Sequence, residues 1–438
     1  MLFIVSTLII TSSFYNNKWG LVNDEFHEYW RSVFDQFVMG RLVKSLQDGA
    51  FSAGGLLLIG DTDHYDVTSK TIRHQYDVYY RGQEFSSYWA YRSTPGLEGI
   101  IFSTIDKYTS FAPETNIRLF RIGTSILSAM IFALILAWIE IEFGIFSYLI
   151  VLASIVLSPW LALMGGSLYW QLWSLYLPFA ITLTLNAYFS RGGTYSIRIM
   201  GIAVFAASLM KILFTGFEFI TTTLVSLTIP FVYYSIRDRW VFDLLIKRLI
   251  HATGFALLGT FLGLVILIGQ ISFESGNLIN GYQYVLEALG RRSIGNPVDH
   301  SGMIADALGA NQWDVIMTYV TGPAYGLGSD FIGGTNVNSL SHLTVLILFF
   351  LFSMVLYYSI RRSEKIKMER KATALLATTW CSILAPLSWL ILFKAHAYIH
   401  TNLDYFVWQL PFMILGFALV GYSVSFWFYP RNGKTSAD

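Results

Sequence analysis

The chain has little charge, a single cysteine and an almost neutral balance of acids and bases. Of its 438 residues 13% are charged, whereas globular domains carry roughly 25%. Its 29 Lys and Arg nearly match 28 Asp and Glu, so it lacks the positive field that attracts nucleic acid. Cys381 has no cysteine to pair with inside the chain. These absences exclude a soluble enzyme, a disulfide scaffold and a nucleic-acid-binding protein.

Long apolar segments are what the sequence has instead. Hydrophobic residues form 54% of the chain, and a membrane-spanning helix needs roughly 20 of them in succession. Nine segments qualify, at about 122–140, 144–164, 169–188, 197–214, 217–235, 251–271, 341–360, 372–393 and 405–428. The opening segment 1–15 is apolar but short, and it lacks the basic start and cleavage site of a signal peptide. The sequence therefore predicts an all-α polytopic membrane protein with about ten transmembrane helices.

The basic residues predict the orientation, because short cytoplasmic loops carry an excess of Lys and Arg. With the N-terminus in the cytoplasm, fourteen basic residues fall on the cytoplasmic side: Arg191, Arg198, Arg237, Arg239, Lys247, Arg248, Arg361, Arg362, Lys365, Lys367, Arg370, Lys371, Arg431 and Lys434. The short loops of the outer side hold only Lys211 and Lys394. Both termini, including the tail 429–438, are therefore expected in the cytoplasm.

Two long loops fall on the outer side in this arrangement. The first covers residues 16–121 and precedes helices 2–7 (122–271), and the second covers 272–339 and precedes helices 8–10 (340–428). The cytoplasmic connections are short and contain no phosphate-binding loop. Any chemistry is therefore expected outside the cytoplasm, where no nucleotide is at hand.

The first outer loop opens with two adjacent acids, Asp24 and Glu25, after Asn23. Apolar residues then recur at helical spacing to about residue 47, which predicts an amphipathic helix lying on the membrane surface. Its residues Trp30, Phe34 and Phe37 are expected to face lipid or the bundle. Acids in a first helical turn commonly stabilise the helix through its dipole, so a structural role and a catalytic role both stay open here.

Further along the same loop, the three aspartates within 61–66 suggest a calcium site. The expected Gly and distal Glu are absent, so a solvated loop is the favoured interpretation. Trp89 and several tyrosines then alternate with Arg81 and Arg92. This mixture is typical of a membrane-interface belt. It equally suits a platform for a sugar ring or a phosphate.

Ionisable residues at the outer ends of spans are candidates for function. Lys211 and Glu218 flank one tight outer turn, and a late outer loop carries Lys394, His396, Tyr398 and His400. Lys and His donors suit a phosphate at the membrane surface, and the alternative is that these side chains snorkel and pack without binding an anion. With no third ligand near the two histidines, a metal site is not predicted. Arg291 and Arg292 of the second long loop are weaker candidates of the same kind, and the Gly-rich run 322–334 is typical of a loop that could cover a site.

This organisation resembles the glycosyltransferase-C superfamily of polytopic membrane enzymes. The resemblance covers the whole chain in organisation, and its sharpest pieces are residues 23–25, 91–98, 216–218 and 394–400. The length and the number of spans are also similar to those of a group of bacterial enzymes. These enzymes use undecaprenyl phosphate glucose to add glucose side chains to the O-antigen of lipopolysaccharide. The sequon-binding residues and the soluble domain of the oligosaccharyltransferases are missing, which favours a glycan or lipid acceptor over a protein.

The resemblance implies an inverting transferase in the bacterial inner membrane, with its active site facing the periplasm. It implies that Asp24 or Glu25 is the catalytic base and that the donor is a polyprenyl-phosphate sugar. Inverting transfer needs a carboxylate for the acceptor hydroxyl and cations for the leaving phosphate. The residues offered for phosphate are Lys211, Lys394, His396, His400, Arg81 and Arg92, and those offered for substrate are Glu218, Tyr398 and Trp89.

Three other interpretations stay open. An O-antigen polymerase or ligase would also act on glycans at the outer face, but it does not need an acidic first loop. A transporter or flippase of lipid-linked sugars predicts internal repeats and charges at mid-membrane, whereas here the charges gather near the outer surface. A membrane protein without catalytic activity is the third. No cofactor is expected, a divalent metal is left open, and the expected partners are the lipid bilayer, the donor lipid and a glycan.

Overall fold

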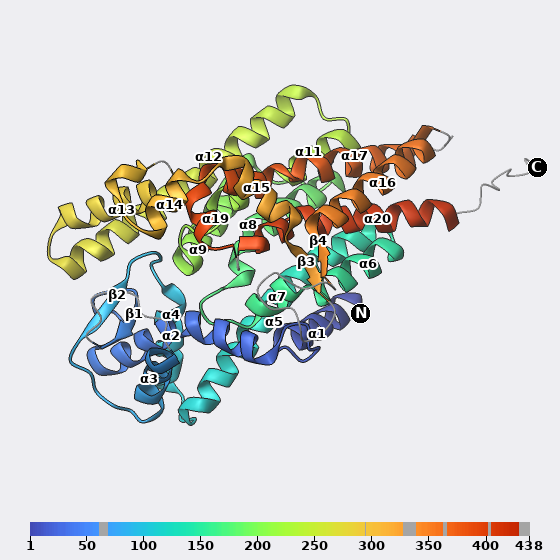
Figure 1. Ribbon diagram of the computed structural model, residues 1–438. Helices are drawn as coiled ribbons and strands as arrows, with labels where there is room; N and C mark the ends of the chain where they lie inside the picture. The colour runs from blue at the N-terminus through green and yellow to red at the C-terminus, as the bar shows by residue number, and fades with distance from the viewer. Residues whose placement is uncertain (61–68, 294, 327–338, 362–365, 402–403, 429–438) are drawn as a thin grey trace, which may run out of the picture.

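A computed structural model describes residues 1–60, 69–293, 295–326, 339–361, 366–401 and 404–428. Nearly all regular structure in these ranges is helical, with two short two-stranded sheets. Figure 1 shows a bundle of long helices with a separate lobe of shorter elements packed at one end. The three aspartates within 61–66 lie outside the described residues. So does most of the Gly-rich run 322–334.

Within the described part of the chain, six helices are long and apolar enough to cross a membrane. They are α5 (Pro113–Phe143), α8 (Leu172–Ser190), α9 (Ile197–Thr215), α12 (Phe242–Ser275), α16 (His342–Arg361) and the stretch Glu369–Leu392, which joins α17 (Ile366–Ser382) to α18 (Leu384–Leu392). A bent pair, α6 (Ile145–Val156) and α7 (Pro159–Gly165), raises the count to seven if it forms one span. The protein is therefore a multi-pass, all-α membrane protein.

The expected total of about ten spans is not confirmed. The first and last predicted segments form α1 (Leu2–Phe14) and α20 (Phe412–Phe428), which are apolar but shorter than a full span. Segment 217–235 divides into α10 (Ile220–Ser226) and α11 (Ile229–Arg237). Pro159 and Pro230 stand at the starts of α7 and α11. A proline lacks an N–H donor and restricts the residue before it, so hydrophobicity alone overestimates helix length here.

The described part of the lobe comprises residues 16–60 and 69–112 and is built around one long helix. Its elements are α2 (Asp24–Asp48), β1 (Leu56–Ile59), α3 (Ser69–Tyr80), β2 (Tyr88–Tyr91) and α4 (Leu97–Tyr108). β1 pairs antiparallel with β2, from Leu56 opposite Tyr91 to Ile59 opposite Tyr88. A side chain at Gly40 of α2 would come within 2.1 Å of the Leu57 carbonyl oxygen, so this glycine lets helix and sheet pack closely.

The surface helix predicted from the first outer loop is α2, but its stretch from Val33 to Ser45 is enclosed by protein instead of lying on a surface. Every residue from Val33 to Ser45 except Phe34 is buried, including Asp35 and Arg41. The expectation of an exposed polar face is therefore wrong for this stretch. The physical reason is that its polar side chains have partners. Arg41, for example, donates to the carbonyl oxygens of residues 50, 52 and 54 at 2.6 to 3.0 Å.

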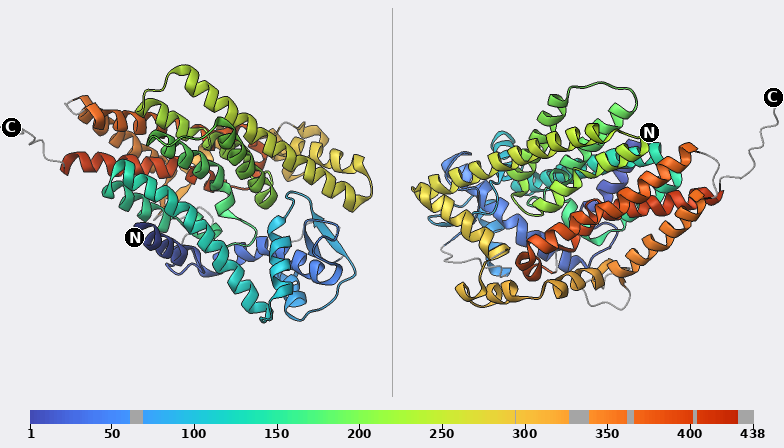
Figure 2. Two further views of the ribbon diagram at one scale, coloured as in Figure 1. Left: turned by 180° about the vertical axis from the view of Figure 1, so that it is seen from behind. Right: turned by 90° about the horizontal axis from the view of Figure 1, so that it is seen from above.

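The second long loop is also largely helical. Its elements are α13 (Leu278–Arg292), the 3-10 turn η1 (Pro297–Asp299), α14 (Met303–Gly309), α15 (Gln312–Thr321) and the strand β3 (Pro323–Gly326), which pairs with β4 (Ser339–Ser341). The late outer segment forms α19 (Lys394–Ile399) and η2 (Asp404–Gln409). In both Figure 1 and Figure 2, α13 and the lobe lie toward one end of the bundle, while the start of α1 and the end of α20 lie toward the other.

Candidate functional site

A tight turn after α1 positions the first acid of α2. Asn16 and Asn17 both adopt left-handed backbone conformations, with φ of 56° and 49°, which asparagine tolerates better than most residues. The buried Asn17 amide accepts from the N–H groups of Leu21 and Val22 and donates to the Val22 carbonyl oxygen. Its Nδ2 also donates to Asp24 Oδ1 at 2.9 Å. The carboxylate of Asp24 is thereby held at one oxygen.

Asp24 and Glu25 are not needed to cap α2. The cap is Asn23, whose side chain accepts from the N–H groups of Glu25 and Phe26 at 3.0 and 3.2 Å. Both acids are exposed. Among the described residues, Asp24 Oδ2 has no hydrogen-bond partner and the Glu25 carboxylate has none. Only Asp24 therefore combines a fixed position with an open oxygen.

Charged residues recur along one face of α2, at positions 24, 28, 31 and 35. Residues spaced by four, seven and eleven positions share one side of a helix. Glu28 forms an ion pair with Arg31, whose Nη1 donates to Asn16 Oδ1 at 2.8 Å. The Asn16–Asn17 turn thus holds a carboxylate through one residue and a guanidinium through the other. As a result, the Asp24 carboxylate and the Arg31 guanidinium lie on one face of α2, about two helical turns apart.

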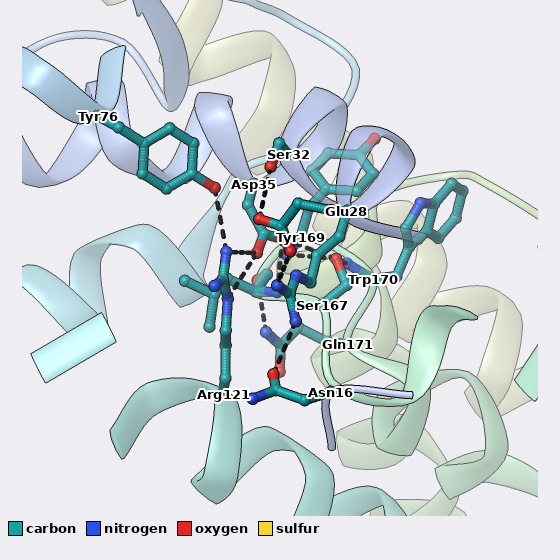
Figure 3. A network of polar contacts seen from close by, with 12 residues as sticks. Asn16, Glu28, Ser32, Asp35, Tyr76, Arg121, Ser167, Tyr169, Trp170 and Gln171 are labelled. Carbon is teal, nitrogen blue, oxygen red and sulfur yellow. Dashed lines mark hydrogen bonds and ion pairs between the residues drawn. The ribbon is translucent and has the colours of Figure 1, made fainter. Parts of the chain in front are cut away.

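The last member of this face, Asp35, lies in a closed polar network (Figure 3). Its Oδ1 accepts from Ser167 Oγ at 2.8 Å and from the Leu168 N–H at 2.7 Å. Its Oδ2 accepts from Arg121 at 3.1 Å, and Arg121 also donates to Tyr76. Asp35 is fully buried. Since both oxygens have partners, Asp35 connects α2 to α5 and to the 167–171 segment instead of offering a reactive group.

A second group of charges, the Glu218 cluster, comprises Lys211, Glu218, Arg292, His396 and Asp404. Glu218 lies 3.2 Å from His396 Nε2 and 3.5 Å from Arg292 Nη1. His396 Nδ1 lies 3.3 Å from Asp404, which also accepts from the Trp389 indole at 2.9 Å. Lys211 Nζ donates to the Gly216 carbonyl oxygen at 2.7 Å and to that of Glu218. The cluster joins the 216–218 turn to α13, α19 and η2.

Two tyrosines connect the lobe with the segment that contacts Asp35. Their hydroxyls, on Tyr91 of β2 and Tyr169, lie 2.9 Å apart. The ring of Phe34 stacks on Tyr169 with centroids 5.4 Å apart, so the aromatic residues of α2 pack toward the bundle. Burial raises the pKa of Tyr91, and the nearby Glu218 carboxylate raises it further. Tyr91 therefore lies between the lobe network and the Glu218 cluster.

The structure brings together only some of the residues predicted to bind phosphate or substrate. His396 and Glu218 meet, and His400 lies beside His396 with ring centroids 4.4 Å apart. Lys394 instead donates to the carbonyl oxygens of Leu308 and Ala310, both at 2.8 Å. Lys211 is fully buried and bound to carbonyl oxygens, so neither lysine presents a free ammonium group.

The remaining predicted residues lie on or just after β2, just after α3, and on α19. Arg92 pairs with Glu274 of α12 at 2.7 Å. Arg81 and Tyr398 are exposed, the first just after α3 and the second on α19. Trp89 is a half-buried residue of β2. In the described part of the chain no hydrogen bond or ion pair joins Asp24 to the Glu218 cluster, so a single site containing both stays a prediction.

Several residues of these polar networks were not identified from the sequence. They are Asn17, Arg31, Asp35, Arg121 and Asp404. A signal for two of them was present, because Arg31 and Asp35 continue the helical spacing that Asp24 begins. Arg121 and Asp404 carry no local signal. Within the described ranges no group of three or more His, Cys, Asp or Glu is arranged to hold a metal ion.

Comparison with protein families, with curated proteins and with solved structures found no match for this chain.

Proposed function

We propose that the protein is an inverting glycosyltransferase of the bacterial inner membrane. It would move a sugar from polyprenyl (undecaprenyl) phosphate to a glycan or lipid-linked glycan acceptor at the periplasmic face, as in glucosylation of O-antigen. The observation that carries the proposal is the state of Asp24. This carboxylate is exposed, oriented by Asn17 through one oxygen, open at the other, and placed at the start of the first helix after α1.

The proposed reaction assigns one role to each charged group. Asp24 Oδ2 accepts the proton of an acceptor hydroxyl, whose oxygen attacks the anomeric carbon of the donor sugar. The bond between that carbon and the phosphate oxygen breaks, and its electron pair leaves with the lipid phosphate. The phosphate then carries up to two negative charges, so cationic donors near it lower the barrier.

We assign this second role to Arg31, which would have to release its partner Glu28. Arg31 lies seven residues after Asp24 on the same face of α2 and is already oriented by Asn16. Its Nε is buried without a partner among the described residues, so it keeps hydrogen-bonding capacity. Of the residues predicted from the sequence to bind phosphate, His400 and Arg81 are exposed and stay candidates. Lys211 and Lys394 would first have to leave their carbonyl partners.

Donor consumption by the purified protein tests this proposal. The chain is reconstituted in lipid nanodiscs and incubated with undecaprenyl phosphate sugars, with and without glycan acceptors. We expect one donor to be consumed only when an acceptor is present. Asp24→Asn should lower the rate by about 10²- to 10⁴-fold, which is the usual contribution of a general base. Glu25→Gln, the matched control one residue away, should stay within a few fold of wild type.

Two outcomes would contradict the proposal. If no donor is consumed with any acceptor while the protein is folded and inserted, glycosyl transfer is wrong. If transfer occurs but both Asp24→Asn and Glu25→Gln retain near-normal rates, the reaction stands and the assignment of the base is wrong.

A further inference from the structure

A largely apolar cavity lies between the lobe and the bundle, and Asp24 is not among its lining residues. Its volume is about 370 Å³, within the range of roughly 300 to 1,000 Å³ that small-molecule sites occupy. It is formed by α4, the first turns of α5, the start of α8 and the end of α9, with Phe102, Phe120, Leu127, Trp173 and Phe214 among its lining residues. Leu119 and Leu127 are 44% and 49% exposed, so the cavity opens on an apolar flank of α5.

One buried acid, Glu98, is among the residues that line this cavity. It is fully buried, and neither carboxylate oxygen has a hydrogen-bond partner among the described residues. Burial raises the pKa of the Glu98 carboxyl well above its ordinary value. The neutral acid can donate one hydrogen bond, whereas the carboxylate could only accept. An unpaired polar group costs free energy unless a partner reaches it, so Glu98 is suited to a ligand that offers an acceptor.

Four of the other polar lining residues, Thr109, Asn116, Gln171 and Trp173, already have partners. Gln171 donates to the Leu168 carbonyl oxygen and accepts from the Trp173 indole at 2.9 Å. Asn116 donates to Asp106. Among the described residues that line the cavity there is no Lys, Arg or His. A phosphate would therefore meet no cation here, while an uncharged acceptor would meet the Glu98 acid.

The position of the cavity at the ends of these helices points to the same kind of ligand. Its walls come from the ends of α5, α8 and α9 that lie next to the lobe. Trp173, an apolar ring with one polar N–H group, is the type of residue that concentrates at the boundary between hydrocarbon and headgroups. In glycerolipids, ester carbonyl groups lie at that boundary, directly above the acyl chains.

We propose that this cavity is a binding site for a glycerolipid of the surrounding bilayer, with one acyl chain along the apolar walls and an ester carbonyl oxygen accepting a hydrogen bond from Glu98. The site is separate from the proposed sugar transfer and does not depend on it. The absence of a lining cation favours an ester lipid over the phosphate end of a polyprenyl lipid.

Native mass spectrometry of the delipidated full chain tests the assignment. The probes are a diester phosphatidylcholine, its diether analogue of equal chain length, and undecaprenyl phosphate. We expect one diester molecule per chain, bound about tenfold more tightly than the diether, because one buried hydrogen bond is worth roughly one order of magnitude in affinity. Glu98→Leu should remove this preference, whereas Glu98→Gln, which keeps a donor, should retain it.

A second pair of variants tests whether the lipid binds in this cavity, independently of Glu98. Leu127→Trp fills the mouth of the cavity and should weaken binding, while Ile126→Trp, at an exposed neighbour outside the lining, should leave it unchanged. The proposal is overturned if wild type binds diester and diether lipids equally. It is also overturned if Glu98→Leu or Leu127→Trp binds the diester as wild type does, or if undecaprenyl phosphate displaces it at equal concentration.

Discussion

Two aspartates on the same helix differ in almost every respect. Asp24 and Asp35 lie eleven residues apart, about three turns of α2. Asp35 is fully buried and accepts from Ser167, from the backbone and from Arg121. Asp24 is exposed and accepts only from Asn17 among the described residues. Both oxygens of Asp35 accept hydrogen bonds from protein groups, whereas Asp24 Oδ2 has no partner among the described residues.

The two aspartates have surroundings suited to different roles, one to stabilising the fold and the other to accepting a proton. A buried charge whose partners are all protein groups fixes the elements that supply them, and its removal leaves those partners unpaired. An exposed carboxylate held at one oxygen contributes little to stability, but it is oriented well enough to take a proton. We therefore expect substitutions at Asp35 to change folding and substitutions around Asp24 to change rate.

The largest effect on stability is expected from Asp35→Ala. Arg121 would be left buried without its counter-charge, which typically costs about 3 to 5 kcal/mol. Denaturant or thermal unfolding in detergent measures the loss. Asp48→Ala is the matched control on the same helix, because Asp48 forms a partly exposed pair with Lys44 and such pairs contribute about 0 to 1 kcal/mol. Equal losses in the two variants would show that the Asp35 network is not a specific anchor.

The next effect concerns pH and His27, which lies between the two aspartates. Burial, followed by the charge of Arg31, lowers the pKa of His27 to about 4. In the unfolded chain the imidazole takes up a proton near pH 6.5, so the unfolded state binds more protons between about pH 6.5 and 4. The free energy of unfolding should therefore fall as the pH is lowered from about 6.5 to 4, by about 2 to 4 kcal/mol in total. His27→Gln should flatten the pH profile, and an unchanged profile would contradict the assignment.

A smaller and mixed effect is expected from Asn17→Ala. The variant loses the bonds that shape the 17–22 turn, which we expect to lower stability by about 1 to 3 kcal/mol. It also releases Asp24, so transfer should slow by about tenfold even at temperatures where the variant is folded. Asn23→Ala is the control, since loss of a helix cap costs about 1 kcal/mol and leaves the Asp24 contact in place. An unchanged rate in folded Asn17→Ala would mean that orientation of Asp24 is unimportant.

The helical membrane architecture could be predicted from hydrophobicity, but the number of spans could not. All ten apolar segments contain helix, yet segment 217–235 is broken between Ser226 and Ile229, and 144–164 bends by 65°. Hydrophobicity measures burial in lipid or in protein alike, so a short core helix and a span give the same signal. Helix α2 shows the opposite error. Its polar residues made it resemble a surface helix, although several of them are buried.

The candidate site was predictable only where its parts are close in sequence. Asn23, Asp24 and Glu25 form a local pattern that is typical of a helix start. Asp35 and Arg121 are 86 residues apart, and nothing in either segment indicates the other. The histidines near 396 were identified as a polar group, but their partner Glu218 comes from a different turn. Such pairs depend on tertiary packing, which residue spacing does not encode.

The most direct test is to measure rate and stability together for Asp24→Asn and Asp35→Asn. Asn is nearly the same size as Asp, so each variant removes one negative charge and little else. We predict that Asp24→Asn lowers transfer by about 10²- to 10⁴-fold with unfolding within about 0.5 kcal/mol of wild type. We predict that Asp35→Asn is destabilised by about 3 kcal/mol or more while its folded fraction retains transfer. If Asp24→Asn transfers normally, or if Asp35→Asn is as stable as wild type, the division of roles between the two aspartates is contradicted.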